Sequence, residues 1–559
     1  MKAARSKSDE FVFLPLGGVG EIGMNLAVYG LGPSNARQWL AVDFGVAFAG
    51  PDLPGVDLIF PDITYLEEER SSLAGIVITH AHEDHFGALL DLWPRLRVPV
   101  YASPFTAGLL AAKRSGHPGA PEIPVTIVTP GQRLQIGPFD VEFIAVAHSI
   151  LEPMALAIRT PLGTVVHTGD WKLDPEPVIG PVTDAKRLAE IGDEGVLALV
   201  CDSTNALREG RSPSESEVAR ELAKLVGEAE GRVFFTTFAS NIARIRSIAL
   251  AAEAADRQVV LVGRALHRAC QVAHELGYLD GLVPFLDEES YGYLPRSKVV
   301  AIVTGSQGEQ RAALARIAAD DHKFIGMSPG DTVVFSARPI PGNEKAINGI
   351  INQLASDGII VVTDRDRLVH ASGHPRRDEL AEMYRWTRPE VAIPVHGEPM
   401  HLAAHAAFAR SLGVPHVIEI EDGVLVRLAP GAAEAIDDVP VGRIYKDGSL
   451  LGDLDAIGVP ERRKLAFAGL VAVSVVLDAK GGLATEPEVA LSGLPLVGPT
   501  GDPFEATVMT AVLGTIESIP RARRRDLELV REALRRAVRA AVRDVWGKKP
   551  VCTIFVAAV

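Results

Sequence analysis

The sequence predicts an α/β protein of several domains, and three observations support this prediction. The chain has 559 residues, and its 47% hydrophobic content is enough for several buried cores. Short apolar runs dominate up to about residue 205, whereas long helical stretches alternate with buried-strand runs over residues 206–365. The last part, residues 465–559, has the order strand, helix, strand. We therefore expect mixed α/β domains.

Four segments precede that last part. Residues 9–205 are expected to form a strand-rich domain, because runs such as FVFLPL, GIVITH and FDVEFIAVAH are separated by Gly and Pro. Over 206–365, helical stretches such as SESEVARELAKLVGEAEG alternate with strands such as RVFFTTF, which is typical of a parallel sheet. Residues 366–428 return to Gly- and His-rich turns, and a linker rich in Pro, Gly and Asp is expected over 429–464.

The last domain combines an apolar strand with an amphipathic helix. The segment LAFAGLVAVSVVL (Leu465–Leu477) is too short to cross a bilayer, and we interpret it as a strand. The later helix carries Arg on the side opposite its apolar positions. That side is either a solvated face or a contact surface for RNA or a partner. The apolar positions are Leu527, Val530, Leu534, Val538 and Val542.

Composition limits the setting and the partners. The chain has 56 Lys+Arg and 71 Asp+Glu, a net charge of -15, which argues mildly against a nucleic-acid partner unless a local basic channel exists. Its three cysteines are far apart, so neither a disulfide framework nor a cysteine zinc site is expected. Because no signal peptide or membrane-spanning run is found, we expect a cytoplasmic protein without membrane contact.

A glycine motif near the N-terminus imitates a dinucleotide-binding fingerprint. Gly18-x-Gly20-x-x-Gly23 follows a strand, and Asp43 lies twenty residues further on. That fingerprint requires a helix after the glycines, whereas MNLAVYGLGPSNARQWLAVDFG has the pattern of two strands around a turn. We therefore expect a tight strand-to-strand turn and no nucleotide site.

Ligand-type residues gather in one short stretch. The sequence ITHAHEDHFGALLDLW places His80, His82, Asp84 and His85 on a turn between a strand and a helix. A turn can direct these side chains at two neighbouring points, and further ligand types stand at the ends of other strands. Imidazole and carboxylate groups without thiolate suit Zn²⁺ or Mn²⁺. Those further candidates are His148, Asp170 and His396, whereas His405 and several other histidines lack motif context and are expected at the surface or at helix ends.

The motif at residues 80–85, with His148 and Asp170 downstream, resembles the signature of the metallo-β-lactamase superfamily. The segments CDSTNA, FASNIARI, TGSQGE, HASGH and PVHGEPMH are similar to motifs of the β-CASP nucleases, and among them to the ribonuclease J family. The resemblance covers residues 9 to 460, and it is weak over the last hundred residues.

The resemblance implies a fold and a cofactor. The fold is an αββα metallo-β-lactamase sandwich in two parts, 9–205 and 366–428, with an inserted β-CASP α/β domain over 206–365 and a small C-terminal α/β domain. The cofactor is two Zn²⁺ or Mn²⁺ ions per chain, with Asp170 shared. The implied ligands are His80, His82, His148 and Asp170 for one ion, and Asp84, His85, Asp170 and His396 for the other.

The resemblance also implies roles for other residues. Asp84 and His374 are the expected catalytic residues, and Asp43 matches an aspartate that supports a metal ligand. Asp57 and Asp453 lie where some bacterial members bind a further structural cation. After the HASGH motif, PRRDE replaces the family's usual Gly- and Ser-rich continuation. The implied substrate-binding residues are Ser240, Asn241, His370, Ala371, Ser372, Gly373 and His374.

The implied activity is hydrolysis of RNA with 5′-phosphate and 3′-hydroxyl products. It combines 5′→3′ degradation that prefers a 5′-monophosphate end with internal cleavage, by two-metal activation of water. His396 stands where RNA-directed members carry His and DNA-repair members carry Val. The resemblance further implies a homodimer or homotetramer and partners in RNA degradation. The alternatives are a hydrolase of a small-molecule ester or thioester, a DNA nuclease of the same fold, and a non-enzymatic RNA-binding subunit.

Overall fold

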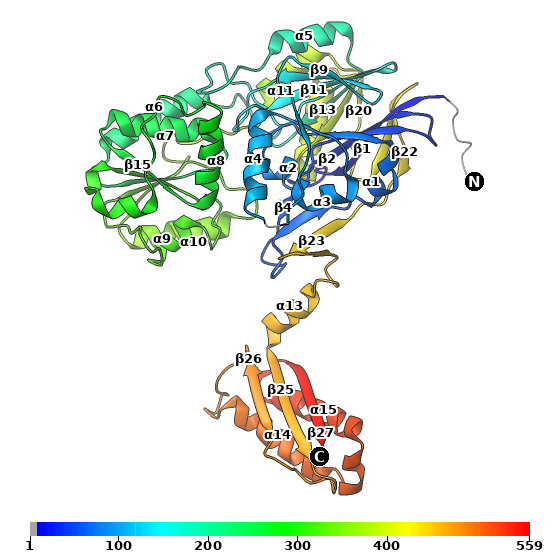
Figure 1. Cartoon of the computed structure of the whole chain (residues 1–559), viewed down its shortest axis with the longest axis vertical. Helices are drawn as coiled ribbons and strands as arrows, with labels where there is room; N and C mark the ends of the chain where they lie inside the picture. Colours follow the sequence, from blue (N-terminus) through cyan, green and yellow to red (C-terminus); the bar gives the residue numbers. More distant parts are fainter. Residues whose placement is uncertain (1–7, 118) are drawn as a thin grey trace. The chain divides into compact units, whose positions relative to one another are not determined.

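A computed structural model describes residues 8–117 and 119–559 and divides the chain into two compact units. The large unit comprises the chain up to Ala47 and Ile59–Arg443, and the small unit comprises Phe48–Leu58 and Ile444–Val559. Figure 1 labels the helices and strands. Among the described residues, none of the helices is both long enough and apolar enough to cross a membrane.

The large unit contains a sandwich of two sheets. In the first sheet, β1, β2 and β3 are antiparallel neighbours, and β3, β6, β7 and β8 run parallel. Its order is β22 (Glu434–Asp438), β21 (Val424–Ala429), β1 (Glu10–Gly17), β2 (Leu26–Gly32), β3 (Gln38–Val42), β6 (Leu73–Val77), β7 (Val100–Ala102) and β8 (Val125–Ile127). The order of the second sheet is β20 (His416–Val417), β19 (Val391–Val395), β13 (Ala198–Asp202), β12 (Gly163–His167), β11 (Met154–Thr160), β10 (Phe139–Ala145) and β9 (Arg133–Ile136).

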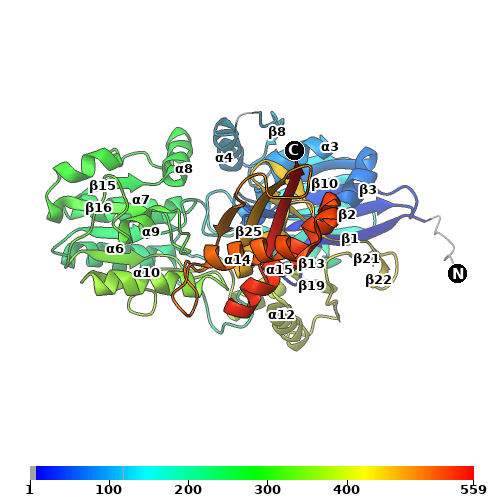
Figure 2. The ribbon, with the colours of Figure 1, turned by 90° about the horizontal axis from the view of Figure 1, so that it is seen from below.

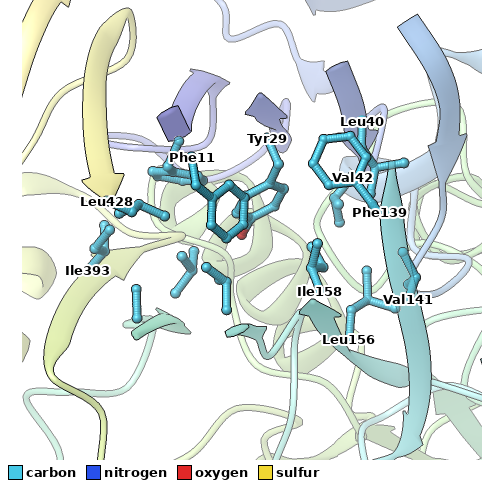
Figure 3. Close-up of a cluster of buried hydrophobic side chains, with 14 of the residues drawn as sticks. Phe11, Tyr29, Leu40, Val42, Phe139, Val141, Leu156, Ile158, Ile393 and Leu428 are labelled. Carbon is cyan, nitrogen blue, oxygen red and sulfur yellow. The ribbon is translucent and has the colours of Figure 1, made fainter. Parts of the chain in front are cut away.

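The facing sides of these sheets form the main core. Because successive strand residues point to opposite faces, alternate apolar residues of each strand fill the space between the sheets. Phe11 and Tyr29 of the first sheet and Phe139 and Ile158 of the second are fully buried in this cluster (Figure 3). On the outer face of the second sheet, α5 (Ala185–Glu194) and α11 (Arg377–Thr387) contribute buried side chains to another apolar cluster. The expected αββα sandwich is thus confirmed.

A second α/β body lies within the large unit (green in Figures 1 and 2). Its five strands are all parallel and almost wholly apolar, and all but the edge strand β18 are largely buried, as expected of a sheet covered on both faces. The sheet order is β15 (Gln258–Val262), β16 (Val299–Val303), β14 (Val233–Thr236), β17 (Thr332–Phe335) and β18 (Ile360–Val362). The helices of this body are α6 (Glu215–Glu228), α7 (Ile242–Ala254), α8 (Arg264–Glu275), α9 (Ala313–Ala318) and α10 (Glu344–Ser356).

The structure corrects two expectations for the region before the last domain. The predicted linker 429–464 contains regular elements, and its β22 pairs with β21 in the first sheet. The predicted strand over Leu465–Leu477 starts later, because a helix continues to Ala468 and Gly469, with a φ of +67°, ends it. The further elements are β23 (Arg443–Asp447), β24 (Leu450–Gly452), α13 (Val459–Ala468) and β25 (Leu470–Leu477).

The small unit has its own three-stranded sheet, in which β25 lies between β26 (Glu488–Ser492) and β27 (Val551–Ala558). Alternate residues of β25 are buried, as expected for a sheet covered on one face. The helices α14 (Phe504–Ser518) and α15 (Leu527–Trp546) provide the apolar side chains opposite that face. Four of the five apolar positions predicted for the last helix are fully buried, namely Val530, Leu534, Val538 and Val542.

Candidate metal centre

The turn after β6 presents the first group of ligand-type side chains. His80 and His82 lie in the loop, and a single helical turn, α2 (Glu83–Phe86), carries Asp84 and His85. The predicted helix over HFGALLDLW is interrupted, because α2 ends at Phe86 and α3 (Leu89–Leu96) begins three residues later. The close approach of Gly45 to the Asp84 carbonyl, where a Cβ would lie 1.7 Å from the oxygen, fixes this turn against the loop after β3.

The other predicted ligands follow the ends of sandwich strands, and they converge on one carboxylate oxygen. Asp170 Oδ2 lies 3.3 Å from His85 Nε2, 3.4 Å from His396 Nε2 and 3.6 Å from His148 Nε2. His80 Nε2 lies 3.8 Å from the same oxygen. The ligand atoms within each of two groups lie within 4.8 Å of one another. These groups are His80, His82, His148 and Asp170, and Asp84, His85, Asp170 and His396.

Three of the histidines are oriented by a hydrogen bond at Nδ1. His85 Nδ1 lies 2.7 Å from Asp43 Oδ2, and His148 Nδ1 lies 2.6 Å from the Gly373 carbonyl. His396 Nδ1 lies 2.9 Å from Asn25 Oδ1. Each bond holds one ring nitrogen and directs Nε2 toward Asp170. This is the arrangement by which proteins fix metal-binding imidazoles.

Two observations test whether these residues fit a bound cation. Asp170 Oδ1 is buried and has no hydrogen-bond partner among the described residues, which is costly for a carboxylate oxygen unless something else binds it. His82 Nδ1 lies 3.1 Å from both His80 Nε2 and His148 Nε2, so three ring nitrogens face one another. A cation between them would satisfy all these groups, and the imidazole and carboxylate donors suit a divalent ion.

The electrostatics of the pair of sites are consistent with this fit. Burial lowers the pKa of His82 to about 4 and holds the pKa of His80 and His148 well below the usual value, so these rings keep a free lone pair at neutral pH. Burial also lowers the pKa of His85, but the carboxylates of Asp170, Asp84 and Asp43 outweigh it and raise the pKa. These carboxylates therefore favour a positive charge, either a protonated ring or a cation, at this side of the site.

The glycine-rich turn near the N-terminus supports the site and precedes no helix. It connects β1 to β2, as predicted. The Gly18 carbonyl accepts a hydrogen bond from the His396 amide, at 2.9 Å. A Cβ at Gly18 would lie 2.3 Å from Asn25 Oδ1, the atom that accepts from His396, and Gly18 has a φ of +91°. The motif therefore requires glycine for close approach to the residues that hold His396.

His374 lies at the rim of the cluster and is held by a carboxylate. Its Nδ1 is 2.8 Å from Asp202 Oδ2 and 3.8 Å from Asp170 Oδ2. Burial lowers the pKa of His374, but Asp202 and Asp170 outweigh it and raise the pKa to about 9. The His374 carbonyl accepts from Asn205 Nδ2 at 3.1 Å and Ser212 Oγ at 3.0 Å, which fixes the loop backbone.

The predicted substrate-binding residues lie around this loop. Asn241 caps α7, where its Oδ1 accepts from the Arg244 amide, and it lines the same pocket as His148. Ser240 precedes it and is half-buried. The Ser372 hydroxyl accepts from Asn205 Nδ2 at 2.8 Å. Ala371 is buried and His370 is half-buried.

The predicted residues of a further cation site lie in the small unit. Asp57 Oδ2 accepts from the Gly448 amide at 2.8 Å, and Asp453 Oδ1 accepts from the Ala456 amide at 2.8 Å. In the described chain, no group of three or more close ligand-type side chains includes either of them. Each carboxylate thus accepts a hydrogen bond from a backbone amide, and the described residues form no cluster of ligand-type side chains around it.

Sequence reasoning missed several supporting residues. Asn25 lies at the end of the glycine motif that imitates a nucleotide site, and Asp202 lies in the segment CDSTNA. Neither position has a sequence pattern that predicts its supporting role. The prediction that His405 lies at the surface or at a helix end is wrong. His405 is fully buried, and its ring nitrogens lie 2.8 Å from Ser203 Oγ and 2.9 Å from Tyr384 Oη. A Ser, a Tyr and a His separated by up to 202 positions carry no common sequence signal.

Family models match most of the chain. The beta-lactamase superfamily domain matches residues 48–188, and the ribonuclease J beta-CASP domain matches 230–354. The Zn-dependent metallo-hydrolase RNA specificity domain matches 358–418, and the ribonuclease J C-terminal domain matches 457–559. A protein of unknown function from Enterococcus faecalis V583 shares the fold, with a TM-score of 0.52 at 18% identity over 75% of this chain and all of that one.

Whole-chain relatives agree with these matches. Ribonuclease J of Sinorhizobium meliloti is 58% identical over the full length of both chains. Ribonuclease J of Mycolicibacterium smegmatis is 40% identical over 96% of this chain and 95% of the relative. The Thermus thermophilus protein is 37% identical over 97% and 94%. The chain is similar to these relatives over almost its whole length, and its His and Asp side chains converge in two groups. The chain therefore belongs to the ribonuclease J family.

Proposed function

We propose that this chain is a metal-dependent ribonuclease that degrades RNA in the 5′→3′ direction from a 5′-monophosphate end and also cleaves internally. The observation that carries the proposal is the convergence of five histidines and two aspartates into two groups that share Asp170. The similarity to proteins named ribonuclease J over their full lengths supports RNA as the substrate. The matching RNA specificity domain supports the same substrate.

The metal ligands follow from the two groups. His80, His82, His148 and Asp170 would hold one Zn²⁺ or Mn²⁺, and Asp84, His85, Asp170 and His396 would hold the second. When bound, such a pair of ions lowers the pKa of water to near neutrality and neutralises charge on the phosphoryl group. Asp43, Asn25 and the Gly373 carbonyl then keep three of the imidazoles in the orientation that binding requires.

His374 is the proposed general acid. Asp202 holds its Nδ1 and favours the protonated ring, so a proton is available at Nε2 for the departing 3′ oxygen. An imidazolium beside the scissile phosphate would also stabilise negative charge that develops there. Asp84, whose side chain is 28% exposed against 2% for Asp170, would orient the attacking water.

The preference for a 5′-monophosphate would come from the region of Ser240, Asn241 and the loop from His370 to His374. Because Asn241 Oδ1 is occupied by the helix cap, its Nδ2 donors remain to face a phosphate. The Ser240 hydroxyl adds a donor next to them. A site that holds one phosphate group in this way would disfavour a triphosphate by size and charge.

The test uses one RNA labelled at its 3′ end that carries either a 5′-monophosphate or a 5′-triphosphate. Wild type, His80→Ala and the exposed control His416→Ala are compared after chelation and after re-addition of Mn²⁺ or Zn²⁺. We expect shortening from the 5′ end of the monophosphate RNA only, restored by metal, with loss of at least 100-fold in His80→Ala and none in the control.

Other outcomes separate the parts of the proposal. If both RNAs are cut only internally and to the same extent, with no shortening from the 5′ end, the 5′-phosphate preference is wrong and the ribonuclease activity stands. Absence of RNA cleavage by metal-loaded wild type, together with turnover of an ester or thioester, would contradict the proposed substrate.

A further inference from the structure

The segment PRRDE after the HASGH motif brings Arg376 close to two other arginines, Arg208 and Arg338, beside the loop from His370 to His374. Arg376 follows His374 by two positions. The Arg377 amide donates to the Arg208 carbonyl at 3.0 Å, so the backbone around Arg208 lies beside the backbone after His374. Asn205 in the same turn binds Ser372 and the His374 carbonyl, which ties this turn to the loop on both sides.

Arg338 reaches the same place from the inserted α/β body. It follows β17, and its backbone carbonyl is held by Gln307 Nε2 at 3.0 Å. Beyond the effect of burial, the charges of Arg338 and Arg376 lower the pKa of Arg208, while Asp364 opposes them. The charge of Arg338 also contributes, after burial and Arg244, to the low pKa of the His370 imidazole. The three guanidinium groups therefore share one region next to the loop from His370 to His374.

Positive charge in this cluster exceeds the local negative charge. Asp364 is 3.2 Å from Arg338 Nη2, whereas in the described residues the guanidinium groups of Arg208 and Arg376 form no ion pair with a carboxylate. The Glu379 carboxylate lies nearby, but it accepts from backbone amides, including that of Arg376 at 2.8 Å. Arg338 Nη1 and Arg376 Nε are buried without a hydrogen-bond partner in the described chain. The neighbouring Arg377 and Arg211, by contrast, pair with Glu209 and Glu382. Among the described residues, Arg338 is the one member of this cluster whose guanidinium is paired with a carboxylate, so the cluster is a local positive excess in a chain of net charge -15.

We propose that Arg208, Arg338 and Arg376 form a subsite for an internal phosphodiester of single-stranded RNA. None of the three belongs to the residues assigned above to the metal ions or to the 5′ end. The inference rests on the proposed ribonuclease function for its ligand. Guanidinium groups bind phosphate oxygens through two parallel hydrogen bonds, and a phosphodiester would supply both the missing negative charge and acceptors. Arg208 is exposed and Arg338 and Arg376 are half-buried, so the cluster is reachable by a polymer.

The test measures binding rather than cleavage. Full-length protein carrying His80→Ala is titrated with an unstructured RNA at several salt concentrations, with a 5′-monophosphate or a 5′-hydroxyl. Arg208→Gln, Arg376→Gln and their combination are compared with Arg385→Gln, an exposed arginine on the same helix α11. Thermal unfolding of each variant checks the fold.

We expect each substitution in the cluster to weaken binding roughly 3- to 10-fold for both RNAs, and the slope of log affinity against log salt to become shallower by about 0.7 per lost phosphate contact. The Arg385 control should match the parent. An unchanged salt slope, or a loss confined to the 5′-monophosphate RNA, would overturn the proposal. If wild type does not cleave RNA but these binding losses appear, the function is wrong and the subsite stands.

Discussion

Two residues of the metal centre have backbone angles that side chains other than glycine rarely adopt. Asp43 has a φ of +65° and His396 a φ of +54°. Such conformations cost on the order of 1–3 kcal/mol each and persist only where surrounding contacts impose them. Here Asp43 binds Thr79 and His85, and His396 is held by Gly18 and Asn25. The strain is thus located at the backbone of residues that form or support the candidate metal centre.

His405 leads to a prediction about acid stability. Burial lowers its pKa to about 4, although the charge of Asp202 opposes this effect. Because the folded pKa lies below the unfolded value of about 6.5, the unfolded state binds more protons between these values, so stability falls as the pH falls from 6.5 toward 4. The unfolding free energy of wild type should fall on acidification from pH 7 to pH 5, and His405→Gln should make this fall smaller by about 2 kcal/mol.

Urea unfolding at the two pH values measures this contribution. The exposed His416→Ala serves as the control and should keep the pH dependence of wild type. If His405→Gln and wild type lose the same free energy on acidification, then His405 is not held neutral in the folded protein.

At the scale of elements, one buried arginine connects α7 to three other segments. Arg244 is fully buried, and its Nε lies 2.5 Å from Glu215 Oε1 at the start of α6. Its Nη1 donates to the Ser336 carbonyl at 2.9 Å and to the Val369 carbonyl at 2.9 Å. Val369 directly precedes the loop from His370 to His374, so this arginine joins the capped end of α7 to that loop.

Arg244→Met should destabilise the large unit by about 3–5 kcal/mol, because it leaves the Glu215 carboxylate buried without its partner. Thermal or urea unfolding of full-length protein measures the loss. The double variant Arg244→Met with Glu215→Gln removes both charges and should recover part of it. A double variant as unstable as the sum of the single variants would show that the pair is not coupled.

Element prediction succeeded where the pattern was long and failed at ends and interruptions. The parallel strands of the inserted body and the apolar face of α15 follow directly from runs and periodicity. The split between α2 and α3 was missed, because the spacing of apolar residues does not record that the Ala88 amide bonds to the Phe44 carbonyl. The strands in 429–464 were missed as well, since β22 is largely exposed and lacks an apolar pattern.

At the scale of the whole molecule, the small unit has a core of its own. Buried residues of β25, α14, α15 and β27 form a single apolar cluster within it. The last strand is central to this arrangement, because β27 pairs with β25 in parallel from Leu470↔Val551 to Leu477↔Ala558. Ile554 and Val556 of β27 are part of the cluster.

A fragment of residues 457–559 should therefore unfold cooperatively on its own, and the same fragment without β27 should not. Circular dichroism and urea unfolding of both fragments provide the measurement. A cooperative transition in the shortened fragment would show that the other elements suffice for a core. Loss of structure in both would show that the small unit needs the rest of the chain.

The sequence by itself determined which ligand-type residues this protein places together and at the ends of its strands. Four ligand-type residues lie in the single turn at residues 80–85. His148, Asp170 and His396 each follow an apolar run that the sequence predicts to be a strand. Only the tertiary structure decided which residues hold those ligands, because Asn25 and His396 are separated by 371 positions and meet through the pairing of sheets. Burial of His405 and the gathering of Arg208, Arg338 and Arg376 were decided in the same way. Periodicity records which face of an element is buried, and it does not record which distant side chain lies against that face.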